Sequence, residues 1–249
     1  MESLLTKLSN KLNRIMHKST SAVILCAGSS TRFSQGSSKS KQMALVCNEP
    51  VILHTLRAFE EAECICEIIL VVRPEDADKY KELIKNSNIG KVKSIVPGGA
   101  TRQESAYLGF KAVSDKAGYV AIHDGARCLI TPEIITEVTK AAHRYKAATA
   151  AARSTDTVKM ADKNGFIKKT IDRDLVWHVQ TPQIFEKKMY NVSLHYAKAN
   201  KIEVTDDCMM AESAGFKVKL VDTGKENIKI TFKNDIMLAE QILKSRRDS

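Results

Sequence analysis

The sequence predicts an α/β protein built on an open, doubly wound and mostly parallel sheet. Short, unbroken apolar runs alternate with amphipathic segments of helical spacing over most of the chain. Strands of a parallel sheet are buried on both faces, so they appear in a sequence as continuous apolar runs. Their regular alternation with helices is typical of the doubly wound arrangement. No apolar run approaches the roughly 18 residues that a membrane span needs.

The elements follow in order along the chain. Strands are predicted at residues 22–26, 68–72, 92–96, 119–122 and 147–152, and helices between them at about 50–62, 75–86, 101–113 and 132–145. Thr101 and Glu104 form a capping-box start for the third helix, and Thr131 before Pro132 gives the fourth an N-cap with proline at the first helical position. Later elements are a helix near 186–199, strands near 216–221 and 227–231, and a final helix from about 233.

Residues 153–185 break this alternation. Two strand-like runs flank the turn Asp162-Lys163-Asn164-Gly165, which predicts a β-hairpin inserted in the frame. A two-stranded hairpin cannot bury its own faces, so we expect this arm to pack on another body such as a second copy of the chain. Residues 19–249 then form a single domain that carries the arm.

Residues 1–18 form a basic amphipathic extension. Its apolar residues fall at helical spacing, and it holds four basic residues and one acid. Three interpretations stay open: a membrane-surface helix or organellar presequence, an appendage packed on the body, or a natural start at Met16. There is no secretory signal, and the six cysteines match neither a zinc site nor a C-x-x-C pair, so a cytoplasmic setting is expected.

The net charge of +10 suggests an anionic partner: nucleic acid, a membrane surface or a phosphorylated substrate. A nucleic-acid binder needs basic residues interleaved with stacking aromatics, and here aromatics are 6% and unclustered. We therefore expect no nucleic acid and no membrane as partners.

The loop after the first strand predicts polyphosphate binding. Its small residues Ala27, Gly28, Ser29 and Ser30 let backbone N–H groups approach a phosphate closely. Positive charge follows in the same loop from Arg32, Lys39 and Lys41. Both the Walker A pattern and the three glycines of a dinucleotide fingerprint are missing, which argues against a dehydrogenase.

Two further loops follow predicted strands. Asp124 ends the strand at 119–122, where it could hold Mg²⁺ beside phosphate oxygens or cap the next turn. Arg127 could pair with Asp124 or clamp a second phosphate. Gly98-Gly99, before the capped helix, permit close backbone contact with a flat base or an anion, or form a simple turn.

Six segments in this order resemble the 2-C-methyl-D-erythritol 4-phosphate cytidylyltransferase family, over about residues 22–239. They are Ala27–Arg32 with Lys41-Gln42, Gly98–Ser105, His123–Arg127, Asp172–Trp177 with Gln180–Gln183, Thr205-Asp206, and Asn227–Thr231. The sequence departs from the family pattern at Ser30, where glycine is common, at Ser40 for proline, at Gly125 for alanine and at Cys128 for proline. Ala100 also stands where an acid often touches the base.

The resemblance implies a Rossmann-like nucleotidyltransferase that transfers CMP from CTP to 2-C-methyl-D-erythritol 4-phosphate and releases pyrophosphate, a step of the non-mevalonate route to isoprenoid precursors. A ribitol 5-phosphate or other polyol-phosphate cytidylyltransferase is the alternative. The implied catalytic residues are Arg32, Lys41, Arg173 and Lys229, with Lys41 favoured over Lys39 because Gln42 follows it.

The resemblance also assigns binding roles. The nucleotide would contact Ala27, Gly28, Ser29, Ser30, Gly99, Ala100, Arg102 and Ser105. The polyol phosphate would contact Asp124, Arg127, Thr157, Arg173, Thr205 and Lys229, and Asp124 would hold Mg²⁺. Thr157 and Arg173 lie on the arm and would reach the site of a neighbouring subunit, which implies a homodimer.

Overall fold

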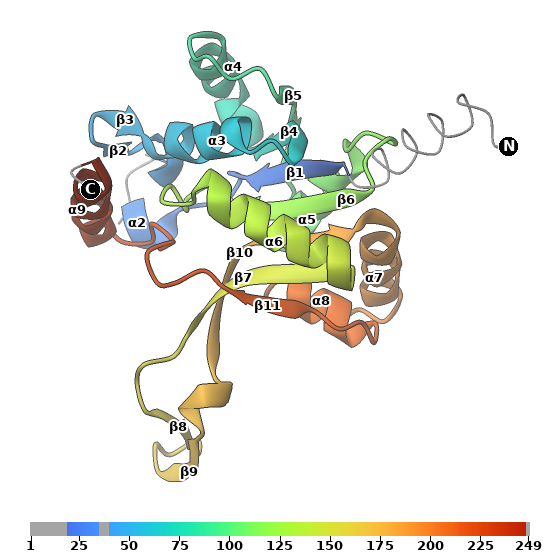
Figure 1. Ribbon diagram of the computed structural model, residues 1–249, viewed down its shortest axis with the longest axis vertical. Coiled ribbons are helices and arrows are strands. Elements are labelled where there is room, and N and C mark those ends of the chain that lie inside the picture. The colour runs from blue at the N-terminus through green and yellow to red at the C-terminus, as the bar shows by residue number, and fades with distance from the viewer. Residues whose placement is uncertain (1–18, 35–39, 248–249) are drawn as a thin grey trace, which may run out of the picture.

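A computed structural model describes residues 19–34 and 40–247, and its centre is a seven-stranded sheet with helices on both faces (Figure 1). The predicted extension at residues 1–18 and Lys39 lie outside the described residues. The strand order is β11-β7-β10-β6-β1-β4-β5, and only β10 runs antiparallel to its neighbours. The strands are β1 (Thr20–Leu25), β4 (Ile65–Val72), β5 (Val92–Pro97), β6 (Tyr119–Asp124), β7 (Ala147–Arg153), β10 (Trp177–Glu186) and β11 (Lys219–Asp222). The predicted fold class is confirmed.

The predicted helices form with small differences at their ends. They are α3 (Val51–Glu61), α4 (Ala77–Lys85), α5 (Arg102–Lys111), α6 (Pro132–Tyr145), α7 (Lys187–Ala199) and α9 (Asn234–Arg247). The capping box is present: the Thr101 side chain accepts from the Glu104 N–H, and the Glu104 carboxylate accepts from the Thr101 N–H. Thr131 caps α6 as its sequence predicts. No helix within the described residues is long and apolar enough to cross a membrane.

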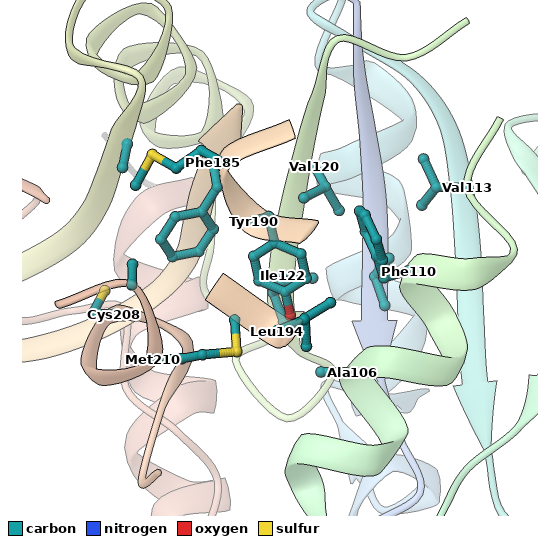
Figure 2. Close-up of a cluster of buried hydrophobic side chains, with 14 of the residues drawn as sticks. Ala106, Phe110, Val113, Val120, Ile122, Phe185, Tyr190, Leu194, Cys208 and Met210 are labelled. Carbon is teal, nitrogen blue, oxygen red and sulfur yellow. The ribbon is translucent and has the colours of Figure 1, made fainter. Parts of the chain in front are cut away.

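The two faces of the sheet bury separate apolar cores. Along β1, Ala22 and Ile24 pack with α3, α4 and α6, whereas Val23 and Leu25 pack with α5, α7 and the short helix α8 (Asp207–Ser213). Figure 2 shows part of the second core, where the Tyr190 ring of α7 lies between Phe110 of α5 and Phe185 of β10. This alternation explains the unbroken apolar run of β1, since residues facing either way are buried.

Three parts of the structure differ from the prediction. The first is β10, a ten-residue strand inserted between β7 and β6; the predicted arm of 153–185 is therefore too long at its end. The second is the short helix α8 (Asp207–Ser213), which was not predicted.

The third difference concerns residues 227–231, where the prediction of a strand is wrong. The segment forms no ladder: Ile230 N–H donates to Ala126 O in the loop after β6, and the Asn227 side-chain amide donates to Gln180 Oε1 and to Thr181 O of β10. The apolar residues of this segment still point inward, and Ile230 is fully buried. The alternation of apolar residues thus predicted their burial correctly, although the segment is not a strand.

The arm itself is a hairpin that leaves the body of the molecule (Figure 1). It is made by β8 (Val158–Ala161) and β9 (Ile167–Ile171), which pair only with each other. Between β1 and α3, the chain forms the short helix α2 (Thr31–Ser34), a 3-10 turn at Lys41–Met43, and the small ladder of β2 (Leu45–Val46) and β3 (Glu49–Pro50).

Candidate active site

A pocket of about 380 Å³ opens at the carboxyl ends of β1, β5 and β6. In the strand order, β1 lies between β4 and β6, so the chain leaves β1 toward one side of the sheet and later returns to its other side. Open α/β sheets bind ligands at this kind of switch point, because the loops on either side diverge and leave a crevice.

Most of the predicted site residues meet in this pocket, although they come from four separate stretches of sequence. Its lining includes Ala27, Gly28, Ser29, Ser30, Arg32, Lys41, Gly99, Ala100, Arg102, Ser105, Asp124 and Lys229. All the nucleotide-contacting residues implied by the resemblance are thus neighbours in space, together with Arg32, Lys41, Asp124 and Lys229. Other lining residues were assigned no role from the sequence: Leu25, Phe33, Gln42, Thr101, Ala126 and Thr231.

Asp124 is the centre of charge in the pocket. Its carboxylate lies 2.8 Å from Lys229 Nζ, 3.5 Å from Arg102 Nε and 3.8 Å from Arg127 Nε. Burial alone would raise the pKa of this carboxyl, but Lys229, Arg102 and Arg127 outweigh burial and hold the pKa well below its usual range. Asp124 is therefore ionised at neutral pH, as a metal ligand must be.

Lys41 is a buried cation that also lines the pocket. Burial, and then repulsion from Lys229, lower the pKa of its ammonium from 10.5 to about 8 despite attraction by Asp124. Among the described residues no carboxylate is within ion-pair distance of Lys41, and its nearest charges are mostly cationic. An anionic ligand would remove this repulsion, so the geometry favours binding of a phosphate here.

The glycine-rich segment is held tightly against β1. A Cβ on Gly98 would lie 2.3 Å from Ala27 Cβ, so only glycine allows the two loops to approach this closely. Ser105 then ties the segment together: its hydroxyl accepts from the Gly99 N–H at 3.1 Å and donates to Thr101 O at 2.9 Å. In this structure Ser105 shapes the wall of the pocket, since its hydroxyl is already engaged.

Ser30 explains one departure from the family pattern. Its φ is 54°, in the left-handed region that glycine adopts without strain. The serine hydroxyl accepts from the Lys41 N–H at 3.3 Å. Ser30 therefore adopts a strained backbone conformation, and its side chain links the first loop to the turn that carries Lys41.

Thr181 links the backbone of Asp124 to the buried side chain of His123. Thr181 Oγ1 accepts from the Asp124 N–H at 3.1 Å and lies 3.0 Å from His123 Nδ1. Burial lowers the pKa of His123 to about 3, so the ring is neutral at physiological pH and its Nδ1 can accept the threonine proton. Thr181 belongs to a motif of the resemblance but was assigned no role from the sequence, because only the fold brings it to Asp124.

Four predicted residues do not line the pocket. Arg127 lies just behind Asp124, where its Nη1 donates to Asn227 O at 2.7 Å. Thr205 is exposed and its hydroxyl contacts Met209 Sδ. Thr157 and Arg173 are exposed on the arm, away from this pocket in the same chain.

The fold and the pocket together define a class of protein. A doubly wound sheet carries, at its switch point, a loop of small residues, several cations, one ionised carboxylate and a glycine segment able to approach a base. Among the described residues no group of three or more metal-ligating side chains occurs, so any metal would rely on ligand oxygens beside Asp124. These features are those of an enzyme that handles a nucleoside polyphosphate.

Comparison with known proteins gives the family. The sequence model of the 2-C-methyl-D-erythritol 4-phosphate cytidylyltransferase family matches residues 20–245, and this chain belongs to that family. A curated 2-C-methyl-D-erythritol 4-phosphate cytidylyltransferase from Caldanaerobacter subterraneus subsp. tengcongensis is 43% identical over 225 residues, which cover 90% of this chain and 98% of that protein.

Solved structures agree with the family. The 4-diphosphocytidyl-2C-methyl-D-erythritol synthase of Anaerococcus prevotii superposes with a TM-score of 0.81 at 33% identity, covering 92% of this chain and 99% of the other. The 2-C-methyl-D-erythritol 4-phosphate cytidylyltransferase of Thermus thermophilus gives 0.72 at 25% identity, with 91% and 99% covered. The predicted family is confirmed, and residues 1–18 precede the matched range.

Proposed function

We propose that this chain transfers CMP from CTP to 2-C-methyl-D-erythritol 4-phosphate, giving 4-diphosphocytidyl-2-C-methyl-D-erythritol and pyrophosphate. The observation that carries the proposal is that Arg32, Lys41 and Lys229 line the same pocket as the glycine segment. Its cations suit a triphosphate, and Gly99 and Ala100 offer a flat backbone surface to a base. Family membership supplies the identity of the base and of the acceptor.

The chemistry needs little beyond position and charge. An oxygen of the acceptor phosphate attacks the α-phosphorus of CTP in line, and pyrophosphate leaves. Since the attacking oxygen is already anionic, no side chain has to remove a proton. Arg32 and Lys41, which line the pocket, would neutralise charge on the transferring group, and Lys229, beside Asp124, would hold the acceptor phosphate.

Magnesium dependence is part of the proposal. Asp124 fits the requirement for one ionised carboxylate in the pocket, because Mg²⁺ in nucleotide sites takes one or two carboxylates together with phosphate oxygens and water. Bound there, the ion would neutralise phosphate charge as pyrophosphate departs. Lys229, 2.8 Å from the same carboxylate, would have to share it or shift toward the acceptor phosphate.

Pyrophosphate release tests the function directly. The enzyme is incubated with CTP and Mg²⁺ together with 2-C-methyl-D-erythritol 4-phosphate or ribitol 5-phosphate, and the nucleotide product is identified by mass spectrometry. We expect product only with the methylerythritol phosphate, and none after EDTA treatment until Mg²⁺ is restored. Turnover with ribitol 5-phosphate alone would overturn the assigned acceptor, and full activity in EDTA would overturn the metal.

We also propose that the active form is a homodimer joined through the arm. Four large apolar side chains of the arm are exposed in the isolated chain: Met160, Phe166, Ile167 and Leu175. Thr157 and Arg173 lie on the same segment without reaching the pocket of their own chain. A partner that covers the apolar side chains would also bring these two polar residues toward a second pocket.

A further inference from the structure

Asp207 is a buried carboxylate that has no part in the sequence motifs or in the mechanism above. It is the first residue of α8 and only 3% exposed. One carboxylate oxygen accepts from Arg102 Nη1 at 2.7 Å and the other from the Tyr190 hydroxyl at 2.6 Å. Arg102 lines the pocket, whereas Asp207 lies behind it. The contact therefore joins the nucleotide wall to the interior of the protein.

The surroundings keep Asp207 in one place. Its backbone N–H donates to Gln183 Oε1 at 2.9 Å, and the Gln183 amide donates to Asp206 at 2.8 Å. The Tyr190 ring is packed between the aromatic side chains of Phe110 and Phe185 (Figure 2), and its hydroxyl donates to Asp207. Burial, and then the charge of Asp207, raise the pKa of Tyr190 well above its usual value, so its hydroxyl stays a donor.

Arg102 lies between two carboxylates. Its Nη1 is 2.7 Å from Asp207, and its Nε is 3.5 Å from Asp124. The guanidinium is a planar fork, so fixing one nitrogen on Asp207 limits where the others can go. Without that hold, the only carboxylate left to Arg102 among its described ion-pair partners would be Asp124, which already has Lys229 at 2.8 Å and Arg127 at 3.8 Å.

We propose that Asp207 is a positioning residue for the nucleotide site: it holds Arg102 in the pocket wall and away from a close pair with Asp124. This has two effects. The guanidinium keeps a fixed orientation toward the nucleotide, and Asp124 keeps charge available for the ligands that enter the pocket. The inference rests on the proposed function in one respect, that the nucleotide occupies this pocket.

The test compares two substitutions on the same contact. Asp207→Asn keeps the shape and an oxygen for Tyr190 but removes the charge that holds Arg102. Tyr190→Phe removes the other hydrogen bond and keeps the charge. CTP affinity is measured by titration calorimetry with and without Mg²⁺, and thermal unfolding is followed in parallel. We expect Asp207→Asn to weaken CTP binding about 10- to 100-fold, in keeping with loss of a charge-assisted contact.

Tyr190→Phe is expected to lower the melting temperature while leaving CTP affinity within about twofold of the wild type. A role limited to stability would instead lower the melting temperature of both variants and leave both affinities unchanged. Wild-type affinity in a folded Asp207→Asn protein would overturn the proposal, as would equal losses of affinity in the two variants.

A double-substitution cycle tests whether Asp207 acts through Arg102. In an Arg102→Gln background, Asp207→Asn should cause no further loss of CTP affinity, because the residue it positions is gone. Independent, additive losses would overturn the proposal. Should Asp207→Asn not fold, the Arg102→Gln protein alone still tests the proposal, because wild-type CTP affinity in that variant would leave Asp207 with nothing to position and would overturn it.

Failure of this inference and failure of the proposed function give different results. Wild-type turnover of CTP with the methylerythritol phosphate tests the function alone. Comparison of CTP affinities between variants tests Asp207 even if the acceptor is a different phosphate.

Discussion

The two cations proposed to contact the triphosphate differ in their burial. Arg32 is exposed at the rim of the pocket, whereas Lys41 is buried. We expect Arg32→Ala or Lys41→Ala to lower kcat by roughly 10²–10³, as loss of a transition-state donor does, with thermal unfolding unchanged for the exposed arginine. Steady-state rates of pyrophosphate release measure the effect, and wild-type kcat in either variant would refute the role assigned to it.

The ionisation of Lys41 predicts a pH dependence. Its pKa is lowered to about 8, so the ammonium is charged below that pH and neutral above it. A neutral amine cannot hold the triphosphate; kcat/KM for CTP, which reports the free enzyme, should therefore fall as pH rises through about 8. In Lys41→Arg the guanidinium stays charged, and the alkaline fall should disappear even if the absolute rate is lower. An identical fall in both proteins would assign it to another group.

Ser30 allows strain and contact to be separated. Ser30→Gly and Ser30→Ala both remove the hydroxyl that accepts from the Lys41 N–H, but only glycine relieves the φ of 54°. We expect both variants to lose about fivefold in kcat/KM for CTP, the equivalent of one hydrogen bond. Ser30→Gly should be more stable than Ser30→Ala by about 1 kcal/mol in urea unfolding. Equal stabilities would show that the backbone is not strained there.

Among contacts between elements, the departure from the family pattern at Gly125 has a structural reason, because the side chain of Cys26 fills the space that a larger residue there would need. A Cβ on Gly125, at the end of β6, would lie 2.4 Å from Cys26 Sγ after β1 and 3.1 Å from Ile52 Cδ1 of α3. Overpacking of this kind costs about 1–3 kcal/mol, so Gly125→Ala should unfold at lower denaturant concentration. Adding Cys26→Ala removes the closest contact, and the double variant should lose less than the two single losses together. Simple additivity would mean that the two sites are independent.

The limits of prediction are also clearest for the elements. Strands buried on both faces, such as β1 and β6, are indicated by unbroken apolar runs, and α5 and α6 by their caps. β10 was missed because its first residues, Trp177 to Val179, are partly exposed beside the arm and give no continuous run. The segment 227–231 has the apolar alternation of a strand, but its hydrogen bonds go to side chains and loops.

The candidate site was more predictable than these elements. Loops at the carboxyl ends of parallel strands lie along one edge of the sheet, so the sequence places the first loop, the glycine segment and Asp124 at that edge. That β5, which precedes the glycine segment, is separated from β1 by β4 is known only from the structure. Asp207 and Thr181 could not be found in this way. Each acts through a contact between residues 57 or more positions apart, from elements that the sequence does not indicate.

At the scale of the whole molecule, the body and the arm have opposite surface character. The body buries its apolar side chains in cores on both faces of the sheet. The arm leaves Phe166 and Leu175 more than two-thirds exposed, at 72% and 77%. A hairpin that pairs only with itself gains little stability from its own contacts. Contact with a second chain would remedy both features at once.

Subunit mixing tests whether the arm completes a neighbouring site. Arg32→Ala and Arg173→Ala proteins are each expected to be nearly inactive. If Arg173 serves the partner's pocket, a mixed dimer holds one intact site, and an equal mixture that has exchanged subunits should recover about a quarter of the wild-type rate. The control is an arm variant, Phe166→Glu with Leu175→Glu, which should elute as a monomer in size-exclusion chromatography with light scattering. Recovery by mixing should be lost in this background, since no partner is held. A mixture no more active than its two components would place Arg173 in its own chain's reaction, or outside the reaction altogether.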